Sequence, residues 1–176
     1  GNTTALPPAV SWVIDGDAPN TLLHVFPPSV TKSAPASFSF SSTEPGIFLC
    51  RVDDGGAASC TSPKTLTGLA HGDHRFEITA IDLAGNADST PAAWSWTVDL
   101  IPPETFLADA GLPAPVTTAT YANFSFTSDS AGFFSCSLLK NGQPQTGPAP
   151  CTSPTTLANL FDGDYVFVVY ATDDAG

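Results

Sequence analysis

Basic residues, methionine and long apolar runs are what this sequence has least of. Five Lys and Arg stand against seventeen Asp and Glu, and the formal net charge is −12. Proteins that bind nucleic acids neutralise phosphates with Lys and Arg, so this balance argues against a nucleic-acid partner. The longest apolar stretch, Val166 to Ala171, is far shorter than the roughly 20 residues that span a bilayer, and we expect no membrane span in this segment. With no Met and no basic-then-apolar leader, the residues are expected to come from the interior of a longer polypeptide.

An internal repeat indicates how many domains the 176 residues form. Residues 36–40 read Ala-Ser-Phe-Ser-Phe, and residues 122–126, at an offset of 86, read Ala-Asn-Phe-Ser-Phe. Further matches are Cys50 with Cys136, Cys60-Thr-Ser-Pro63 with Cys151-Thr-Ser-Pro154, Gly72–Phe76 with Gly163–Phe167, and Asp82–Gly85 with Asp173–Gly176. The offset grows from 86 to 91 between the two cysteines, which places a five-residue insertion in a hairpin loop of the second copy. The repeat predicts two domains rather than one.

The start of the chain resembles the end of the first copy. Pro8-Ala-Val-Ser-Trp12-Val-Ile-Asp15 matches Pro91-Ala-Ala-Trp-Ser-Trp96-Thr-Val-Asp99, so that Trp12 corresponds to Trp96. We therefore expect residues 1–17 to hold the last strand of a preceding unit plus a linker. Residues 18–100 are expected to form one complete unit, and residues 101–176 a second unit that stops before its own last strand.

Strand patterns dominate both copies. Phe38 and Phe40 alternate with serines, and Trp94 and Trp96 alternate with polar residues, as in strands with one buried face. No segment keeps a 3.6-residue period, and Gly or Pro interrupts nearly every ten residues. For the complete unit we predict seven short strands, near residues 20–26, 36–42, 46–53, 57–60, 64–67, 74–81 and 93–99. Seven strands in about 85 residues predict an all-β chain of tandem two-sheet sandwiches, with tight turns supplied by the Gly and Asn residues of 53–56 and 141–142.

The four cysteines fall two per unit, at matched positions. The pairs Cys50–Cys60 and Cys136–Cys151 would each close a hairpin and stabilise its unit by roughly 3 kcal/mol. A four-cysteine metal site and free buried thiols are the alternatives, although no short Cys-x-x-Cys spacing favours a metal. Disulfides would imply an oxidising compartment, so we expect an extracellular or cell-surface location, a flagellar or ciliary surface included.

The run from Cys50 to Asn86 resembles a known family. Its cysteine pair, its Gly-x-[His/Tyr]-x-Phe motif and its Asp-x-x-Gly-Asn turn are similar to tandem repeats of the bacterial-type Ig-like/fibronectin III-like superfamily, and the likeness covers nearly all of both units. The resemblance implies seven-stranded sandwiches in large surface or fibre proteins, such as bacterial adhesins and algal flagellar-hair (mastigoneme) proteins. It also implies a tyrosine corner at Tyr165, whose hydroxyl would close onto nearby backbone. His74 replaces that tyrosine in the first unit.

Two sets of residues are candidates for carrying a glycan or a metal ion. The sequons at Asn2 and Asn123 predict N-glycosylation sites, and the alternation turns Asn123 away from the core. Four acids at the expected unit junctions are candidate Ca²⁺ ligands: Asp15, Asp17, Asp99 and Glu104. Two carboxylates per junction are few for an ion that takes six to eight oxygens, and turn formation explains the same residues. We therefore expect no cofactor, with Ca²⁺ as the one candidate.

No arrangement of residues predicts catalysis. His71, Asp73 and His74 lie together, and a Ser/His/Asp set could be drawn from them. A triad, however, needs a base oriented by a buried partner beside a pocket, and the second copy of this loop carries Asp162 and Tyr165 instead. Paired carboxylates, a Gly-rich phosphate loop and metal-spaced histidines are absent from the sequence. We expect no catalytic residues and a protein that is not an enzyme.

The two copies differ on the outward face of one strand. In the first copy these positions hold Arg75, Glu77, Thr79 and Ile81. In the second they are apolar, and the predicted interface comprises Val166, Val168 and Tyr170 with Phe133 and Leu139 on a neighbouring strand. An exposed apolar stripe typically marks an interface, although a neighbouring unit, the missing last strand or a glycan would also cover it.

These observations predict a non-catalytic structural or spacer array in an extracellular fibre or surface protein. The expected partners are neighbouring units of the same chain and protein contacts within a filament or an adhesion assembly. The alternative is a carbohydrate-binding or appendage module of a secreted glycan-active protein. That alternative predicts exposed aromatic residues, for which Tyr121 and Tyr170 are candidates, whereas the three Trp occupy inward-looking positions of the pattern.

Overall fold

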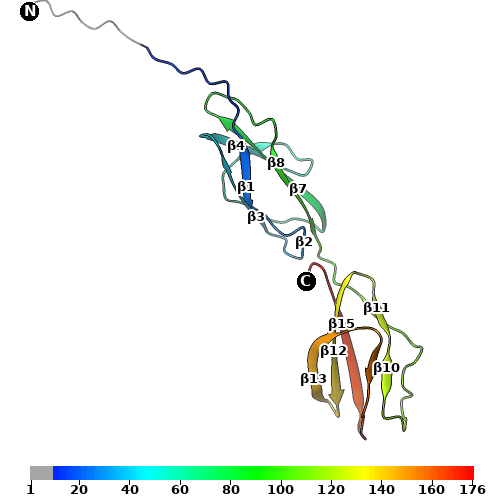
Figure 1. Cartoon of the computed structure of the whole chain (residues 1–176). Helices are drawn as coiled ribbons and strands as arrows, with labels where there is room; N and C mark the ends of the chain where they lie inside the picture. Colours follow the sequence, from blue (N-terminus) through cyan, green and yellow to red (C-terminus); the bar gives the residue numbers. More distant parts are fainter. Residues whose placement is uncertain (1–9) are drawn as a thin grey trace, which may run out of the picture. The chain divides into compact units, whose positions relative to one another are not determined.

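The computed structural model describes residues 10–176, and strands are the only regular elements in that range. The chain divides into two compact units, with the main boundary between Trp96 and Thr97, and residues 29–34 and 70–72 group with the second unit. The modules named below are defined by strand pairing instead, which joins β2 to β8. Strands β1 to β8 form what we call the N-terminal module, and strands β9 to β15 form the C-terminal module (Figure 1). In the part described, no helix has the length and apolarity needed to cross a bilayer. The prediction of an all-β chain is confirmed.

Two sheets make up the N-terminal module. One is antiparallel and has three strands in the order β1-β3-β6: β1 (Thr21–Val25), β3 (Ala36–Ser42) and β6 (Lys64–Leu66). The other has five strands in the order β2-β8-β7-β4-β5: β2 (Val30–Thr31), β8 (Ala92–Val98), β7 (Gly72–Asp82), β4 (Gly46–Val52) and β5 (Ala58–Cys60). The short strand β2 runs parallel to β8, and the sequence pattern did not predict it.

The core of this module lies between the two sheets. Phe38 and Phe40 point inward from β3, as their alternation with serine predicts, and both are buried. The Phe38 ring lies 4.5 Å from that of Phe76, and the Phe40 ring lies 4.9 Å from that of Phe48 in an edge-to-face arrangement. Trp96 of β8 is 2% exposed and packs on Phe38. Aromatic pairs contribute roughly 0.5–1.5 kcal/mol each beyond their buried area, so this cluster is a large part of the module's stability.

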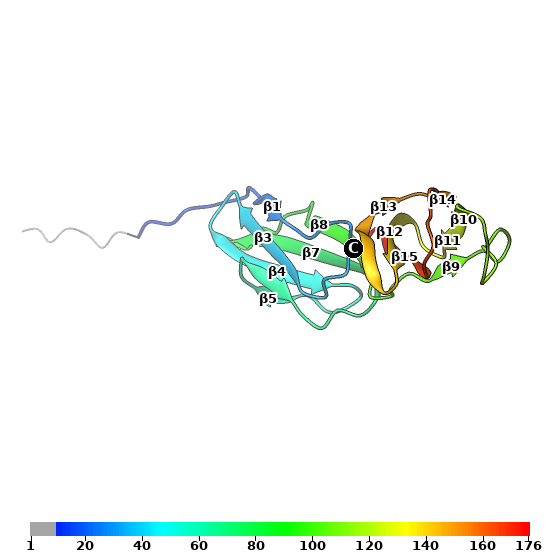
Figure 2. The same cartoon turned by 90° about the horizontal axis from the view of Figure 1, so that it is seen from below.

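The C-terminal module has seven strands, which form three small sheets (Figure 2). Its strands are β9 (Thr105–Leu107), β10 (Ala122–Phe124), β11 (Phe126–Ser128), β12 (Gly132–Lys140), β13 (Gln143–Cys151), β14 (Thr155–Leu157) and β15 (Tyr165–Asp173). They pair as β10-β14, as β11-β9 and as a three-stranded sheet in the order β13-β12-β15. Phe124 stacks on Phe167 at 4.2 Å, and Phe126 meets Phe134 edge-on at 4.9 Å. Phe167 and Phe134 are only partly buried.

All four cysteines form disulfides, and the pairing is the predicted one. Cys50 joins Cys60, and Cys136 joins Cys151, with a Cα–Cα distance of 5.8 Å in both. Each bond closes one hairpin, β4–β5 in the first module and β12–β13 in the second. The alternatives of a four-cysteine metal site and of free thiols are therefore wrong. The five-residue insertion lengthens β13 to nine residues, compared with three in β5.

The turns follow the sequence with one correction. Asn141 and Gly142 both have positive φ, at 50° and 75°, as predicted for a tight hairpin turn. In the 53–56 turn, however, the left-handed residue is Asp53 (φ 51°) and not one of the two glycines. Asp53 tolerates this conformation because its Oδ1 accepts a hydrogen bond from the Arg75 backbone N–H (2.8 Å).

A buried carboxylate ties strand β1 into the N-terminal module. Asp88 is 5% exposed, its Oδ2 accepts from the Thr21 backbone N–H (2.7 Å), and its Oδ1 accepts from the Thr90 backbone N–H (2.8 Å). Burial raises the pKa of Asp88, but the hydrogen bonds from Thr21 and Thr90 outweigh burial and hold it below its ordinary value of 3.8. The ionised form of Asp88 is thus favoured by folding.

Substitution of Asp88 by alanine should destabilise the N-terminal module by about 1–3 kcal/mol at neutral pH, because the buried Thr21 N–H loses its partner. Since the pKa is lower in the folded state, the stabilisation is present above pH 3.8 and is lost as the pH falls through the folded pKa. Urea unfolding at neutral pH and at about pH 3 should show the difference between wild type and Asp88→Ala narrowing in acid. Asp54→Ala, in an exposed turn, is the control and should unfold like wild type. A difference that stays constant with pH would contradict the assignment.

Candidate functional site

The predicted interface residues gather on one face of β12 and β15. Val166 lies opposite Leu139, while Val168 and Tyr170 lie opposite the outward-facing serines of β12, and Phe133 stands on the same face near the other end. Phe133, Tyr170 and Val166 are 60%, 57% and 54% exposed, and Val168 and Leu139 are half-buried. The structure thus brings these five side chains into a single apolar surface, which we call the β12–β15 face.

On the equivalent face of the N-terminal module, charged side chains pair around Glu77, while Ile47 lies exposed on the same face. Glu77 of β7 accepts from Arg51 Nη2 at 3.0 Å through Oε1 and from Arg75 Nη2 at 3.1 Å through Oε2. The hydrogen bond from Arg75, followed by the bond and positive charge of Arg51, lowers the pKa of Glu77. The positions of Arg75 and Glu77, which form ion pairs in one module, are therefore held by the apolar Val166 and Val168 in the other.

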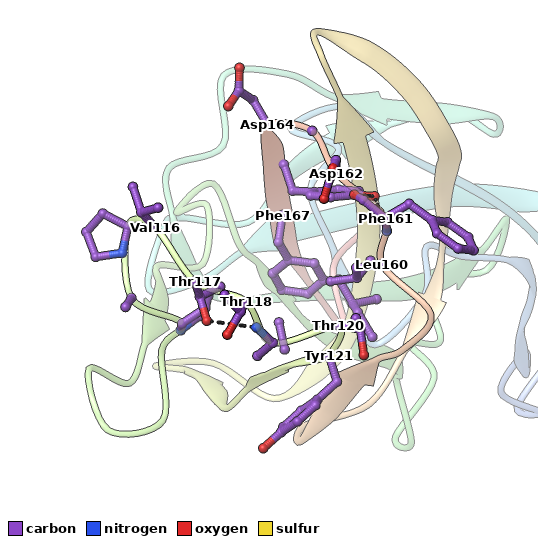
Figure 3. Close-up of a pocket in the computed structure, with 18 of the residues that line it drawn as sticks. Val116, Thr117, Thr118, Thr120, Tyr121, Leu160, Phe161, Asp162, Asp164 and Phe167 are labelled. Atoms are coloured by element: carbon purple, nitrogen blue, oxygen red, sulfur yellow. Dashed lines mark hydrogen bonds between the residues drawn. The ribbon is translucent and has the colours of Figure 1, made fainter.

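A hollow of about 600 Å³ opens into the C-terminal module beside β10 and β15. Apolar side chains from several elements line it, namely Phe124, Leu138, Leu157, Leu160 and Phe167. In Figure 3 the Phe167 ring lies between the Val116–Thr118 loop and Leu160. The exposed aromatics Tyr121 (58%) and Phe161 (77%) also line it, and so do Asp162 and Asp164. We call this feature the C-terminal hollow.

A tyrosine corner fixes one wall of the C-terminal hollow. The Tyr165 hydroxyl donates to the Phe161 backbone C=O (2.8 Å) and accepts from the Phe161 backbone N–H (3.1 Å). This is the closure onto nearby backbone that the family resemblance implies. In the N-terminal module His74 stands at the position of Tyr165 and has other partners. Its Nδ1 lies 2.9 Å from Asp53 Oδ2, and its ring lies 5.6 Å from that of Trp96.

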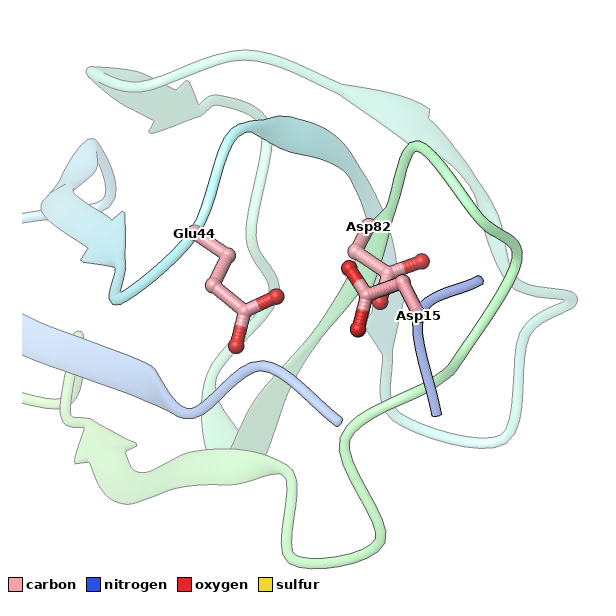
Figure 4. Close-up of side chains that lie close together, drawn as sticks. All are labelled: Asp15, Glu44 and Asp82. Atoms are coloured by element: carbon pink, nitrogen blue, oxygen red, sulfur yellow. The ribbon is translucent and has the colours of Figure 1, made fainter. Parts of the chain in front are cut away.

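Three carboxylates converge at one end of the N-terminal module. Single oxygens of Asp15, Glu44 and Asp82 all lie within 4.8 Å of one another, and Figure 4 shows the three side chains facing a common space. Asp82 is 7% exposed and accepts from Asn86 through both oxygens, from the backbone N–H and from Nδ2, each at 2.8 Å. Desolvation and the repulsion of Asp15, Asp82 and Asp17 raise the pKa of Glu44. The cluster offers oxygen ligands of the type that Ca²⁺ prefers, but only three carboxylates.

The calcium candidates named from the sequence do not form one set. Asp15 belongs to the cluster, and Asp17 lies next to it, with its N–H donating to Asp15 Oδ1 (3.1 Å). Asp99 instead accepts from the Ile101 N–H (3.1 Å), and the Glu104 N–H donates to Asp129 Oδ1 (2.9 Å). These bonds form local turns or bridge neighbouring strands. Glu44 was not predicted from the sequence, because its carboxylate reaches Asp15 and Asp82 from a separate loop with no short spacing motif.

The sequons, the histidines and the tryptophans were also named from the sequence. Asn123 is exposed on β10, and its Oδ1 accepts from Thr156 Oγ1 (2.7 Å). Asn2 lies outside the described residues. The three histidines have three different partners: His24 with Ser41 (2.7 Å), His71 with Asp99 (3.4 Å) and His74 with Asp53 (2.9 Å). Trp96 is buried, as its inward-facing position in the sequence pattern predicts. Trp12 has the same position in the pattern but is 76% exposed.

Comparisons with known proteins add little to this geometry. No family model matches the sequence, and no curated protein matches it either. Among solved structures, the chain is similar to part of a Streptomyces avermitilis alpha-L-rhamnosidase crystallised with L-rhamnose, at a TM-score of 0.27 and 14% identity. The likeness covers 88% of this chain and 22% of that protein. At such a TM-score it carries no argument about the fold or the function of this chain.

Proposed function

We propose that this chain is a non-catalytic spacer segment of a large extracellular fibre or cell-surface protein. Its modules would be Ig-like or fibronectin III-like sandwiches arranged in tandem, as in an adhesin or a flagellar-hair-like filament. The observation that carries the proposal is the repetition of one stapled module, with the same hairpin closed by a disulfide in both copies. Repeated units that differ on their surfaces but keep the same disulfide are suited to a protein segment that sets distance and bears load.

Several features support an extracellular setting for such a segment. Disulfides persist in oxidising compartments and are rare in the cytosol. Asn123 is exposed at a sequon, on the outward side of β10, where a glycan would have room. The β12–β15 face would supply a lateral contact with a neighbouring protein, because apolar residues exposed at this level typically mark interfaces.

Single-molecule pulling on the oxidised chain tests the load-bearing role. Each module should give one discrete rupture, because stretching it requires the cooperative loss of its sheets. Reduction should lengthen the N-terminal module's extension by about 29 Å and the C-terminal module's by about 47 Å. The bonds bypass 10 and 15 residue steps of ~3.5 Å each, and the 5.8 Å between the paired Cα atoms is subtracted from each product.

A variant with Cys50→Ser and Cys60→Ser serves as the matched control for the pulling experiment. It should show only the shorter increment without a reductant, while the second module keeps its oxidised length. A chain that extends smoothly at low force, with no discrete rupture, would contradict the spacer proposal.

A carbohydrate-binding module is the second candidate, and the rim of the C-terminal hollow supports it. Tyr121 and Phe161 are exposed there beside Asp162 and Asp164, and flat aromatic faces next to carboxylates suit sugar rings. A glycan-binding screen of the wild-type chain and of Tyr121→Ala separates the two functions. Binding that is lost in Tyr121→Ala would favour the carbohydrate module over the spacer.

A further inference from the structure

Strand β13 is a long and exposed edge strand. It has nine residues, Gln143–Cys151, of which eight are exposed, and within residues 10–176 it pairs with β12 alone. Its counterpart β5 is also the outermost strand of its sheet. The outer edge of such a strand normally presents unpaired backbone N–H and C=O groups, which can pair with a strand of another molecule. An edge of nine residues is therefore a potential site of association.

Two hydrogen bonds show in which direction the N–H groups of β12 point. The Ala171 N–H of β15 donates to Thr105 Oγ1 (3.0 Å), so it points away from β12. Opposite residues of an antiparallel pair either exchange hydrogen bonds or both point away from each other, so the N–H of its partner Phe134 points toward β13. The Leu138 N–H points the same way, because it donates to Thr146 Oγ1 of β13 (3.1 Å). Since the direction alternates along a strand, the odd-numbered residues of β12 point toward β15 instead.

The prolines of β13 stand where its backbone faces away from β12. Pro150 lies opposite Ser135 and Pro144 lies opposite Leu139, and both of these β12 residues are odd-numbered. Neither proline therefore faces its partner with a backbone nitrogen, and the N–H of any other residue at these two positions would point outward. Pro148 lies between them, in the first of the two register shifts of β13. Because proline has no N–H, the strand lacks a donor at all three positions.

Two copies of this edge could not form a regular ladder with each other. A ladder needs N–H donors opposite C=O acceptors, and the outer edge of β13 would set carbonyl oxygens against one another wherever a proline stands. A polar backbone group that leaves water without finding a partner costs free energy. The two register shifts also twist β13 out of the regular form that a partner strand would need.

The equivalent edge of the N-terminal module has no such prolines. Strand β5, Ala58–Cys60, is only three residues long and contains none. A short edge strand offers few backbone groups to a partner, so its length alone protects it. The second copy has the longer hairpin, and all three prolines of β13 lie in the stretch between the Asn141–Gly142 turn and Cys151. The prolines are thus found only on the copy whose edge is long.

We propose that Pro144, Pro148 and Pro150 close the outer edge of β13 to strand pairing, and that the partner they exclude is the same edge of a second copy of this chain. Without them, two β13 strands would pair across a two-fold axis and join two three-stranded sheets into one, because the same edge would face itself. This role goes beyond the spacer function and does not rest on it, so its failure would leave the pulling test unaffected.

Sedimentation of the oxidised 176-residue chain over a range of concentrations tests the proposal. Pro148→Thr combined with Pro150→Thr restores two backbone donors to β13, and the association constant should rise about tenfold or more over wild type. The chain offers a matched control, because residues 113–115 also read Pro-Ala-Pro and are exposed but belong to no strand. Pro113→Thr combined with Pro115→Thr should therefore sediment like wild type. A Pro148→Thr/Pro150→Thr chain that associates no more than wild type overturns the proposal.

Amide hydrogen exchange of the same variant identifies the contact. The new amides at positions 148 and 150 should exchange more slowly as the concentration rises, because they would donate across the interface. If they exchange equally fast at all concentrations, the copies meet at another surface, and the proposal is overturned. Exchange on β12 and β15 reports whether the C-terminal module is folded, and Pro150→Thr alone repeats the test with a single change. If the module unfolds in both variants, the prolines are required by the hairpin itself, which also overturns the proposal.

Discussion

Alanine at Gly46 or at Gly132 should unfold the module that carries it. The two glycines occupy the same repeat position, at the start of β4 and of β12, directly opposite the end of the neighbouring long strand. A Cβ at Gly46 would overlap the backbone carbonyl oxygen of Ile81, and one at Gly132 would overlap that of Thr172. The backbone of a paired strand cannot move aside as the end of a flexible side chain can. We therefore expect each substitution to lower the free energy of unfolding of its module by about 3 kcal/mol or more.

Gly56→Ala is the matched control for both substitutions, because a Cβ at that position would meet no atom within 4 Å. Native-state amide hydrogen exchange reads the two modules separately in one chain. Gly46→Ala should accelerate exchange throughout the N-terminal module and leave the C-terminal module unchanged, and Gly132→Ala should do the reverse. Wild-type exchange rates in either variant would show that the strands separate at little cost.

Phe76→Ala should cost more stability than Phe167→Ala, although the two residues occupy the same repeat position. Phe76 is 0% exposed and packs on Phe38 at 4.5 Å and on Phe40 at 6.4 Å, so truncation leaves an enclosed cavity and should cost about 3–5 kcal/mol. Phe167 borders the C-terminal hollow and is partly exposed, and its loss should cost about half as much. Hydrogen exchange within each module gives both values, and equal losses would contradict this account of the hollow.

The strands were predictable from the sequence wherever one face of the strand is buried and the other is exposed to solvent. Ala36–Ser42 has the predicted limits, because Phe38 and Phe40 alternate with serine along the whole strand. The disulfides were predictable since the repeat puts each cysteine pair at matched positions. Strand β2 was not, because Val30–Thr31 has no alternation of its own and becomes a strand only by lying beside β8.

The candidate sites were harder to predict than the strands. The β12–β15 face follows from alternation alone, so Val166, Val168 and Tyr170 were found. The acidic cluster depends on three separate segments that only the folded chain brings together, and Glu44 carries no sequence signal for it. The C-terminal hollow was not predicted either, because its lining comes from separate segments that only the folded chain brings together.

The two clamped hairpins point to a use in protein engineering. They differ by five residues in loop length, with sequence separations of 10 and 15, yet the Cα atoms of both cysteine pairs are 5.8 Å apart. The clamp therefore has the same span whatever length of chain it encloses. Foreign peptide inserted at the Asn141–Gly142 turn would be displayed at the tip of the β12–β13 hairpin, which the Cys136–Cys151 bond closes, and this makes the module a scaffold for epitope presentation.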